Sequence, residues 1–188
     1  MKKVIAIIVM GIIIGVYILS IKNTGETKKT VLTNLPPVSE RLQVIKEEIE
    51  EHYPATPKEV IEKHNELMEM GYSTDIKDED FEAYAQNLRM LYTKQLQELN
   101  PLEEQVNKLI AERILSEDKP LIIITSEIED ITIVKDSSTD EEKSAEALVK
   151  HGTNKGSTIK KYRLIKEDGM WKIQAWETQK SEDADVEE

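Results

Sequence analysis

The chain has 188 residues, no cysteine and a formal net charge of −12. The absence of cysteine excludes disulfide bonds, thiolate metal ligands and a cysteine nucleophile. A surface this acidic repels phosphate groups, so nucleic acid is not an expected partner.

An apolar run without a charge, Val4 to Ile21, follows Lys2 and Lys3. As a helix, residues 4–21 would span about 27 Å, close to the hydrocarbon thickness of a bilayer. The two lysines and the short N-terminal tail predict a cytoplasmic N-terminus and an extracytoplasmic remainder. A cleaved signal peptide is the alternative, although the run is longer than usual and lacks a small-x-small cleavage site. We therefore predict a single-pass anchor over residues 1–21, retained in the cell membrane.

Gly11 and Gly15 form a Gly-x-x-x-Gly pair within this run. Such a pair lets two membrane helices approach closely and favours a homodimer within the membrane. Glycine is also common in membrane helices that make no such contact. The pair therefore leaves both interpretations open.

Residues 22–38 are polar and show no apolar period, which predicts a tether between the anchor and a folded domain. Ser39 is expected to cap a helix that runs to about Glu51. The segment Thr56-Pro57-Lys58-Glu59 combines a capping residue, a proline in the first turn and the glutamate of a capping box. It predicts a helix that runs to about residue 70 and is ended by Gly71.

A second core helix is expected to start at the acidic residues 78–80 and to continue to about residue 99, because apolar side chains recur at helical spacing. Those side chains are Phe81, Tyr84, Ala85, Leu88, Leu91, Tyr92, Leu96 and Leu99. Asn100-Pro101 then repeats the cap-proline pattern, which predicts a third helix that stops before Pro120.

From Leu121 onward the apolar period changes to two, which is typical of strands. Ile122, Ile124 and Ile128 share one face, but Ile131 and Ile133 fall on the opposite one. We expect a bulge near Glu129 to reconcile the two phases. Two turns follow, over residues 136–140 and 152–156, with a strand between them in which Ala145, Ala147 and Val149 share a face.

The strongest local signal is the hairpin over residues 159–177, in which strand-forming runs flank Asp168-Gly169. Alternation places Trp171 and Ile173 on one face and Trp176 on the other. Helices followed by antiparallel strands predict an α+β domain over residues 39–178, with the helices packed on one face of a curved sheet. Residues 179–188 are acidic and predict a disordered tail.

This pattern, with its Tyr53–Val60, Asn100–Glu104 and Asp168–Ile173 segments, resembles the nuclear transport factor 2-like superfamily. Within that superfamily the chain is similar to an uncharacterised family of small membrane-anchored bacterial proteins. The resemblance covers about residues 39–178 and implies a cone-like fold with a pocket between sheet and helices. The superfamily contains isomerases, dehydratases, cyclases and binding or assembly modules, so the fold does not select a function.

His64 is the main catalytic candidate, because it lies on the apolar stripe of the first core helix, and such helices line the pocket in enzymes of this fold. A histidine there could act as a general base. The alternative is a packed histidine with one hydrogen bond, which we favour because no orienting partner is visible from spacing.

Tyr84 and Tyr92 are candidate ligand-binding residues on the buried side of the second core helix, and the alternative is that both are core residues. Trp176 is a candidate for an interaction surface on the outer face of the sheet, if the Trp171 face meets the helices. The opposite assignment of the two faces stays open.

Several signatures of catalysis and metal binding are missing from the sequence. It has no Gly-x-Ser-x-Gly elbow, no glycine-rich phosphate loop and no His-Glu-x-x-His, and its three histidines do not form a zinc pattern. We therefore predict neither a metal nor a cofactor. The expected role is that of a non-catalytic binding or assembly module, with a protein partner or a homodimer, and the alternative is an isomerase or dehydratase that uses His64.

Overall fold

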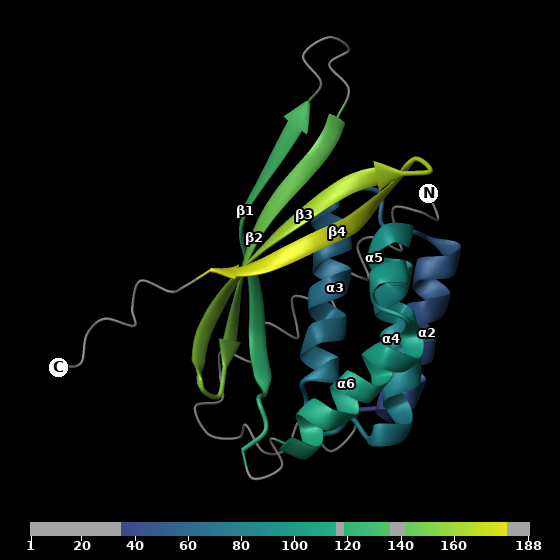
Figure 1. Cartoon of the computed structure of the whole chain (residues 1–188), viewed down its shortest axis with the longest axis vertical. Helices are drawn as coiled ribbons and strands as arrows, with labels where there is room; N and C mark the ends of the chain where they lie inside the picture. Colours follow the sequence, from purple (N-terminus) through teal and green to yellow (C-terminus); the bar gives the residue numbers. More distant parts are fainter. Residues whose placement is uncertain (1–34, 116–118, 136–141, 180–188) are drawn as a thin grey trace, which may run out of the picture. The chain divides into compact units, whose positions relative to one another are not determined.

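The computed structural model describes residues 35–115, 119–135 and 142–179 (Figure 1). The helical part comprises α2 (Val38–Glu51), α3 (Pro57–Gly71), a 3-10 turn η2 (Asp78–Asp80), α4 (Phe81–Met90), α5 (Lys94–Leu99) and α6 (Leu102–Leu115). The strands are β1 (Ile123–Lys135), β2 (Glu142–Thr153), β3 (Gly156–Glu167) and β4 (Met170–Gln179). They form one antiparallel sheet in the order β1-β2-β3-β4. The α+β class and the helices packed against the sheet are confirmed, and the sheet is open, with β1 and β4 at its edges.

The predicted anchor with Gly11 and Gly15, and the acidic residues 180–188, lie outside the described residues. Within the part of the chain that is described, no helix has both the length and the hydrophobicity needed to cross a bilayer. The membrane assignment and the homodimer therefore stay predictions.

The capping box predicted for α3 is confirmed. The Thr56 hydroxyl accepts a hydrogen bond from the Glu59 amide at 3.2 Å, and the Glu59 carboxylate accepts one from the Thr56 amide at 3.1 Å. The predicted cap of α2 is wrong, because that helix begins at Val38 and Ser39 lies within its first turn. Pro37 precedes the helix and makes no side-chain cap.

The second core helix is interrupted where a single helix was predicted. The Thr93 amide donates to the Ile173 carbonyl at 3.0 Å, and the Ile173 amide donates to the Leu91 carbonyl at 2.8 Å. These bonds satisfy backbone groups on the open edge of β4, which a continuous helix would leave unpaired. Thr93 then caps α5, since its hydroxyl accepts from the Leu96 amide at 3.2 Å.

The Asp168-Gly169 turn is confirmed, and both of its residues have positive φ, 53° and 78°, as a two-residue hairpin turn requires. The bulge expected near Glu129 is also confirmed, because the register with β2 shifts between Ile128 and Asp130. The predicted face of Ile122 and Ile124 is wrong. A second shift, between Ile123 and Thr125, buries Ile123 and leaves Ile124 63% exposed.

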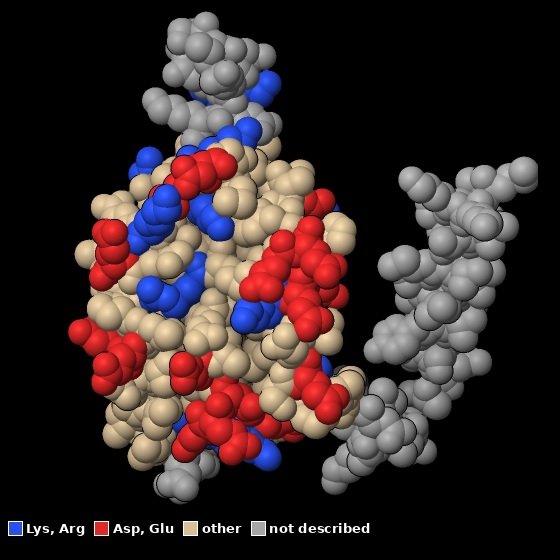
Figure 2. All heavy atoms as spheres, turned by 90° about the vertical axis from the view of Figure 1, so that its right-hand side faces the viewer, with Lys and Arg blue, Asp and Glu red and all other residues tan. Residues whose placement is uncertain are grey.

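Small side chains on β2 form the centre of the sheet's buried face. Ala145, Ala147 and Val149 are fully buried, as their alternation predicted. Helix α3 runs beside this face and α2 and α4 lie farther from the sheet (Figure 1), whereas α5 contacts β4. On the helix side of the domain, Asp and Glu gather in several clusters with Lys and Arg between them (Figure 2). The hydrophobic core therefore lies between the sheet and a charged outer layer of helices.

Candidate functional site

A cavity of about 210 Å³ opens between the sheet and the helices. Its polar lining residues are His64, Asn100, Gln105, Lys108, Glu112 and Lys160, and its aromatic lining residues are Tyr72, Tyr84, Tyr92, Tyr162 and Trp176. An engineered cavity of about 150 Å³ in another protein binds benzene. The cavity therefore has room for a ligand that contains one ring.

His64 lies on the buried stripe of α3 and borders the cavity, where its side chain is only 2% exposed. Its Nε2 atom is 3.5 Å from the Tyr92 hydroxyl, and its Nδ1 atom has no hydrogen-bond partner within the described part of the chain. Burial, and then the positive charge of Lys160, lower the pKa of His64 to about 3. The ring is therefore neutral at physiological pH.

Tyr84 and Tyr92 also border the cavity, so the structure brings both tyrosines together with His64. The Tyr84 hydroxyl lies 3.7 Å from the sulfur of Met68, whereas the Tyr92 hydroxyl faces His64. Tyr92 is held in place by the short pairing of residues 91–93 with β4. Burial raises the pKa of both phenols, so both stay protonated and can donate hydrogen bonds. Ligand binding by these tyrosines stays a prediction.

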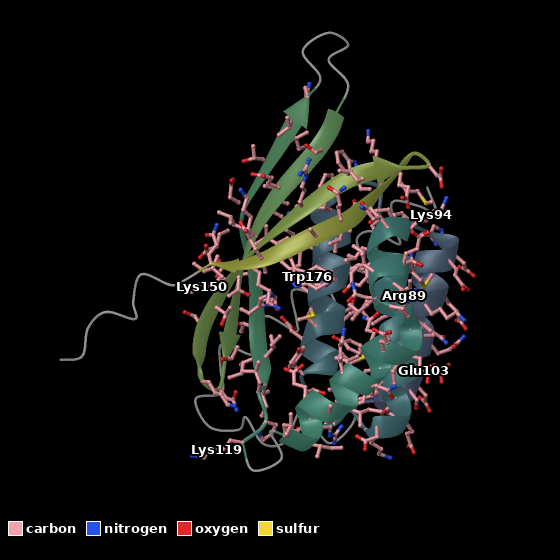
Figure 3. The ribbon with its side chains drawn as sticks, in the orientation of Figure 1. Arg89, Lys94, Glu103, Lys119, Lys150 and Trp176 are labelled. Atoms are coloured by element: carbon pink, nitrogen blue, oxygen red, sulfur yellow. The ribbon has the colours of Figure 1, made fainter. Side chains whose placement is uncertain are left out.

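The predicted outer-face position of Trp176 is wrong. Between the pairs Leu164–Ile173 and Arg163–Ala175 the register of β3 and β4 shifts by one residue. This irregularity changes the phase of β4, so that Trp176 returns to the face that Ile173 occupies. Its ring lies beside that of His64, with 6.4 Å between the centroids, and Trp176 stands between β4 and α3 in Figure 3.

The rings of His64, Tyr92, Tyr162 and Trp176 pack on one another and form a continuous surface, which we call the aromatic wall. Neighbouring ring centroids are 5.1 Å apart for His64 and Tyr162 and 5.6 Å apart for Tyr92 and Trp176. Centroid separations of this size are typical of packed aromatic pairs. Because Trp176 remains 41% exposed, the wall is reachable from solvent.

A second buried histidine supports the wall from the sheet side. The His151 Nδ1 atom is 2.9 Å from the Ser126 hydroxyl, and its Nε2 atom is 3.3 Å from the Tyr162 hydroxyl. Burial, and then the charge of Lys160, lower the pKa of His151 to about 4. This chain of hydrogen bonds fixes the Tyr162 ring and links it to β1.

Lys160 is the one cationic residue of β3 that lines the cavity, two positions before Tyr162 on the same face. It is half-buried and has no ion-pair or hydrogen-bond partner within the described residues, whereas its neighbour Lys161 pairs with Glu146 at 2.9 Å. Burial lowers the pKa of Lys160, and the nearby Glu112 raises it again in part. The cavity therefore holds a cation whose charge is incompletely compensated.

Sequence reasoning found His64, Tyr84 and Tyr92 but missed His151, Lys160 and Tyr162 as members of this site. The burial of His151 could have been predicted, because it continues the alternation of buried residues Ala145, Ala147 and Val149. Tyr162 and Lys160 belong to the hairpin that the sequence predicted, but their face follows only from the pairing with β2.

A larger hollow of about 570 Å³ lies between the segment after α3 and the end of α6, with Tyr72, Ile76 and Arg113 in its lining. Its lining includes Ile114 and Pro120, which flank in sequence the residues 116–118 that lie outside the described part of the chain. Among the described residues, no group of three histidine or acidic side chains is placed to hold a metal ion. The smaller cavity with the aromatic wall is therefore the candidate site.

Comparison with protein families gave one match. Residues 1–176 match the family model described as Domain of unknown function (DUF6715). Searches of curated proteins and of solved structures found no match.

Proposed function

The chain belongs to the DUF6715 family, a domain family of unknown function, and on that premise we propose that the domain is a non-catalytic module that binds a small ligand in its cavity. This proposal depends mainly on one observation: the aromatic wall lines the same cavity as polar groups that have no hydrogen-bond or ion-pair partner within the described residues. These groups are His64 Nδ1, the Gln105 side-chain oxygen and the Lys160 ammonium. Apolar cavities with a few converging polar groups are the usual form of ligand sites.

The same residues support binding better than catalysis. A general base works best when its pKa lies near the operating pH, and burial lowers that of His64 to about 3. A catalytic histidine also needs a hydrogen-bond acceptor that orients its ring. The Nε2 atom of His64 instead contacts the hydroxyl of Tyr92. The alternative, an isomerase or dehydratase with His64 as base, rests on the position of His64 beside the cavity and on its Nδ1 atom, which has no partner within the described residues. A pKa of His64 near 7, measured by NMR, would favour that alternative.

Two features of the wider chain belong to this proposal. The order of helices before a twisted antiparallel sheet supports membership of the nuclear transport factor 2-like superfamily, with its cone-like fold. The uncharged run over residues 4–21 supports a membrane-anchored module with a cytoplasmic N-terminus and an extracytoplasmic domain. An experimental structure with a different order of strands in the sheet would contradict the first of these.

The proposed topology predicts that protease added to intact cells removes the domain, whereas a cytoplasmic control protein survives. The physical reason is that residues 22–188 would lie outside the cytoplasmic membrane. The measurement is immunoblotting against the C-terminal part of the chain. A domain that stays protected until the cells are lysed would contradict the topology.

Ligand binding in the cavity predicts that benzamide, a neutral single-ring probe, raises the thermal midpoint of the full chain in detergent. The variant Leu109→Phe fills the cavity from α6, where Leu109 is part of the lining, and should abolish the increase. Leu99→Phe is the matched control, because Leu99 is exposed and does not line the cavity. An equal increase in both variants would contradict binding at this site.

A further inference from the structure

We propose that the cavity takes a small monocarboxylate carried on a flat, apolar ring, with the Lys160 ammonium holding the carboxylate and the aromatic wall holding the ring. This inference rests on the proposed binding function and names the chemical class of the ligand.

The first argument is the position of Lys160. Taking an ammonium group out of water is costly unless a negative charge comes close. On the same strand Lys161 satisfies this requirement through Glu146, but Lys160 has no hydrogen bond or ion pair within the described part of the chain. An entering carboxylate would supply the missing counter-charge with a charge-assisted hydrogen bond.

The second argument is the set of charges that face the cavity. They are Lys160 from β3, and Lys108 and Glu112 from α6. Lys108 and Glu112 are exposed, and Glu112 also accepts a hydrogen bond from Tyr72 at 3.4 Å. Two cations and one anion line the cavity, and Glu112 offsets the charge of Lys160 only in part. This surplus of positive charge favours an anion over a cation beside Lys160.

The third argument is the form of the aromatic wall. Here the rings of Tyr162 and Trp176 pack against His64 with centroids 5.1 and 6.4 Å away. They present a surface on which a flat ring can stack, and a cavity of about 210 Å³ accommodates one ring with a carboxylate.

His64 supplies a second donor for the same ligand. When the Tyr92 hydroxyl donates to Nε2, the neutral imidazole carries its proton on Nδ1, the atom that has no partner within the described residues. Because the ring is fully buried, an unpaired N–H there is unfavourable. Nδ1 is closed to solvent, so a carboxylate oxygen would satisfy it once the His64 ring turns toward the cavity that it borders, while the other oxygen contacts Lys160.

The test compares benzoate, benzamide and benzylamine, which share a ring and differ in charge. Affinities for the full chain in detergent are measured by tryptophan fluorescence. We expect benzoate to bind best and Lys160→Met to weaken it about tenfold, the size expected for one charge-assisted hydrogen bond. Benzamide affinity should stay within about twofold in the same variant, which shows that the cavity is intact. Lys161→Met, on the opposite face of β3, should leave all three affinities unchanged.

The outcomes separate the two proposals. Equal binding of benzoate and benzamide, unaffected by Lys160→Met, would overturn the monocarboxylate assignment and leave the binding function standing. A preference for benzylamine would overturn it in favour of a cation site. Should Lys160→Met lose benzamide as well, Lys160→Arg decides, because it keeps the charge and must retain the benzoate preference. Failure of all three probes to bind would overturn the binding function itself.

Discussion

Lowering the pH from 7 to 5 is expected to reduce the free energy of unfolding by roughly 4 kcal/mol, through His64 and His151 together. Their pKa values are lowered to about 3 and about 4 in the folded domain, against about 6.5 in an unfolded chain. Between those values the unfolded chain binds more protons than the folded one. The contribution of the two histidines to the free energy of unfolding is therefore present above pH 6.5. It is lost as the pH falls toward their folded-state pKa values of about 4 and about 3.

Urea unfolding of the full chain at pH 7, 6 and 5, followed by tryptophan fluorescence, measures this effect. His64→Gln and His151→Gln should each remove about half of the pH dependence, because both rings are neutral in the folded domain over this pH range. His52→Gln is the control, since the His52 side chain is 86% exposed. A pH dependence that is the same in all three variants would show that the two buried histidines are not its source.

Replacing Gly71 with alanine is expected to destabilise the domain by about 3 kcal/mol, at the upper end of the usual cost of overpacking. A Cβ atom at this position would lie 2.1 Å from Cζ and 2.4 Å from the hydroxyl oxygen of Tyr84. Tyr84 is fully buried and its ring is rigid, so the ring or the end of α3 must move. Gly71 is thus required by close packing, at the position where the sequence predicted that the helix ends.

The experiment is a double-mutant cycle by urea unfolding. Tyr84→Leu removes the ring atoms that the new Cβ would meet, so Gly71→Ala should cost much less in that background. Gly152→Ala is the matched control, because the closest atom to its Cβ is the side-chain oxygen of Thr125, at 2.6 Å, which can rotate away. Equal costs of Gly71→Ala with and without the Tyr84 ring would refute the packing explanation.

The parts of the fold that depend on local pattern were predictable. The capping box at Thr56, the positive-φ turn at Asp168-Gly169 and the bulge at Glu129 all follow from short-range geometry. His64 was found for the same reason, since helical spacing places it on the buried stripe of α3.

The parts that depend on distant pairing were not predictable. Trp176 lies on the inner face of the sheet because β4 shifts its register against β3. No residue type in the hairpin predicts that shift. The break between α4 and α5 exists because residues 91–93 bond to Ile173 of β4, about 80 positions away along the chain. Both features bring aromatic rings to the cavity, so the site is completed by contacts that a local pattern cannot contain.

The central claim is that the cavity beside the aromatic wall admits a ligand. The most direct test labels the two tryptophans of the full chain with nitrogen-15 and follows their indole signals during a titration with benzamide. Trp176 lines the cavity, whereas Trp171 is 2% exposed and does not. A saturable shift of the Trp176 signal with an unchanged Trp171 signal is the predicted result. A Trp176 signal that stays constant, or two signals that move together without saturation, would contradict the claim.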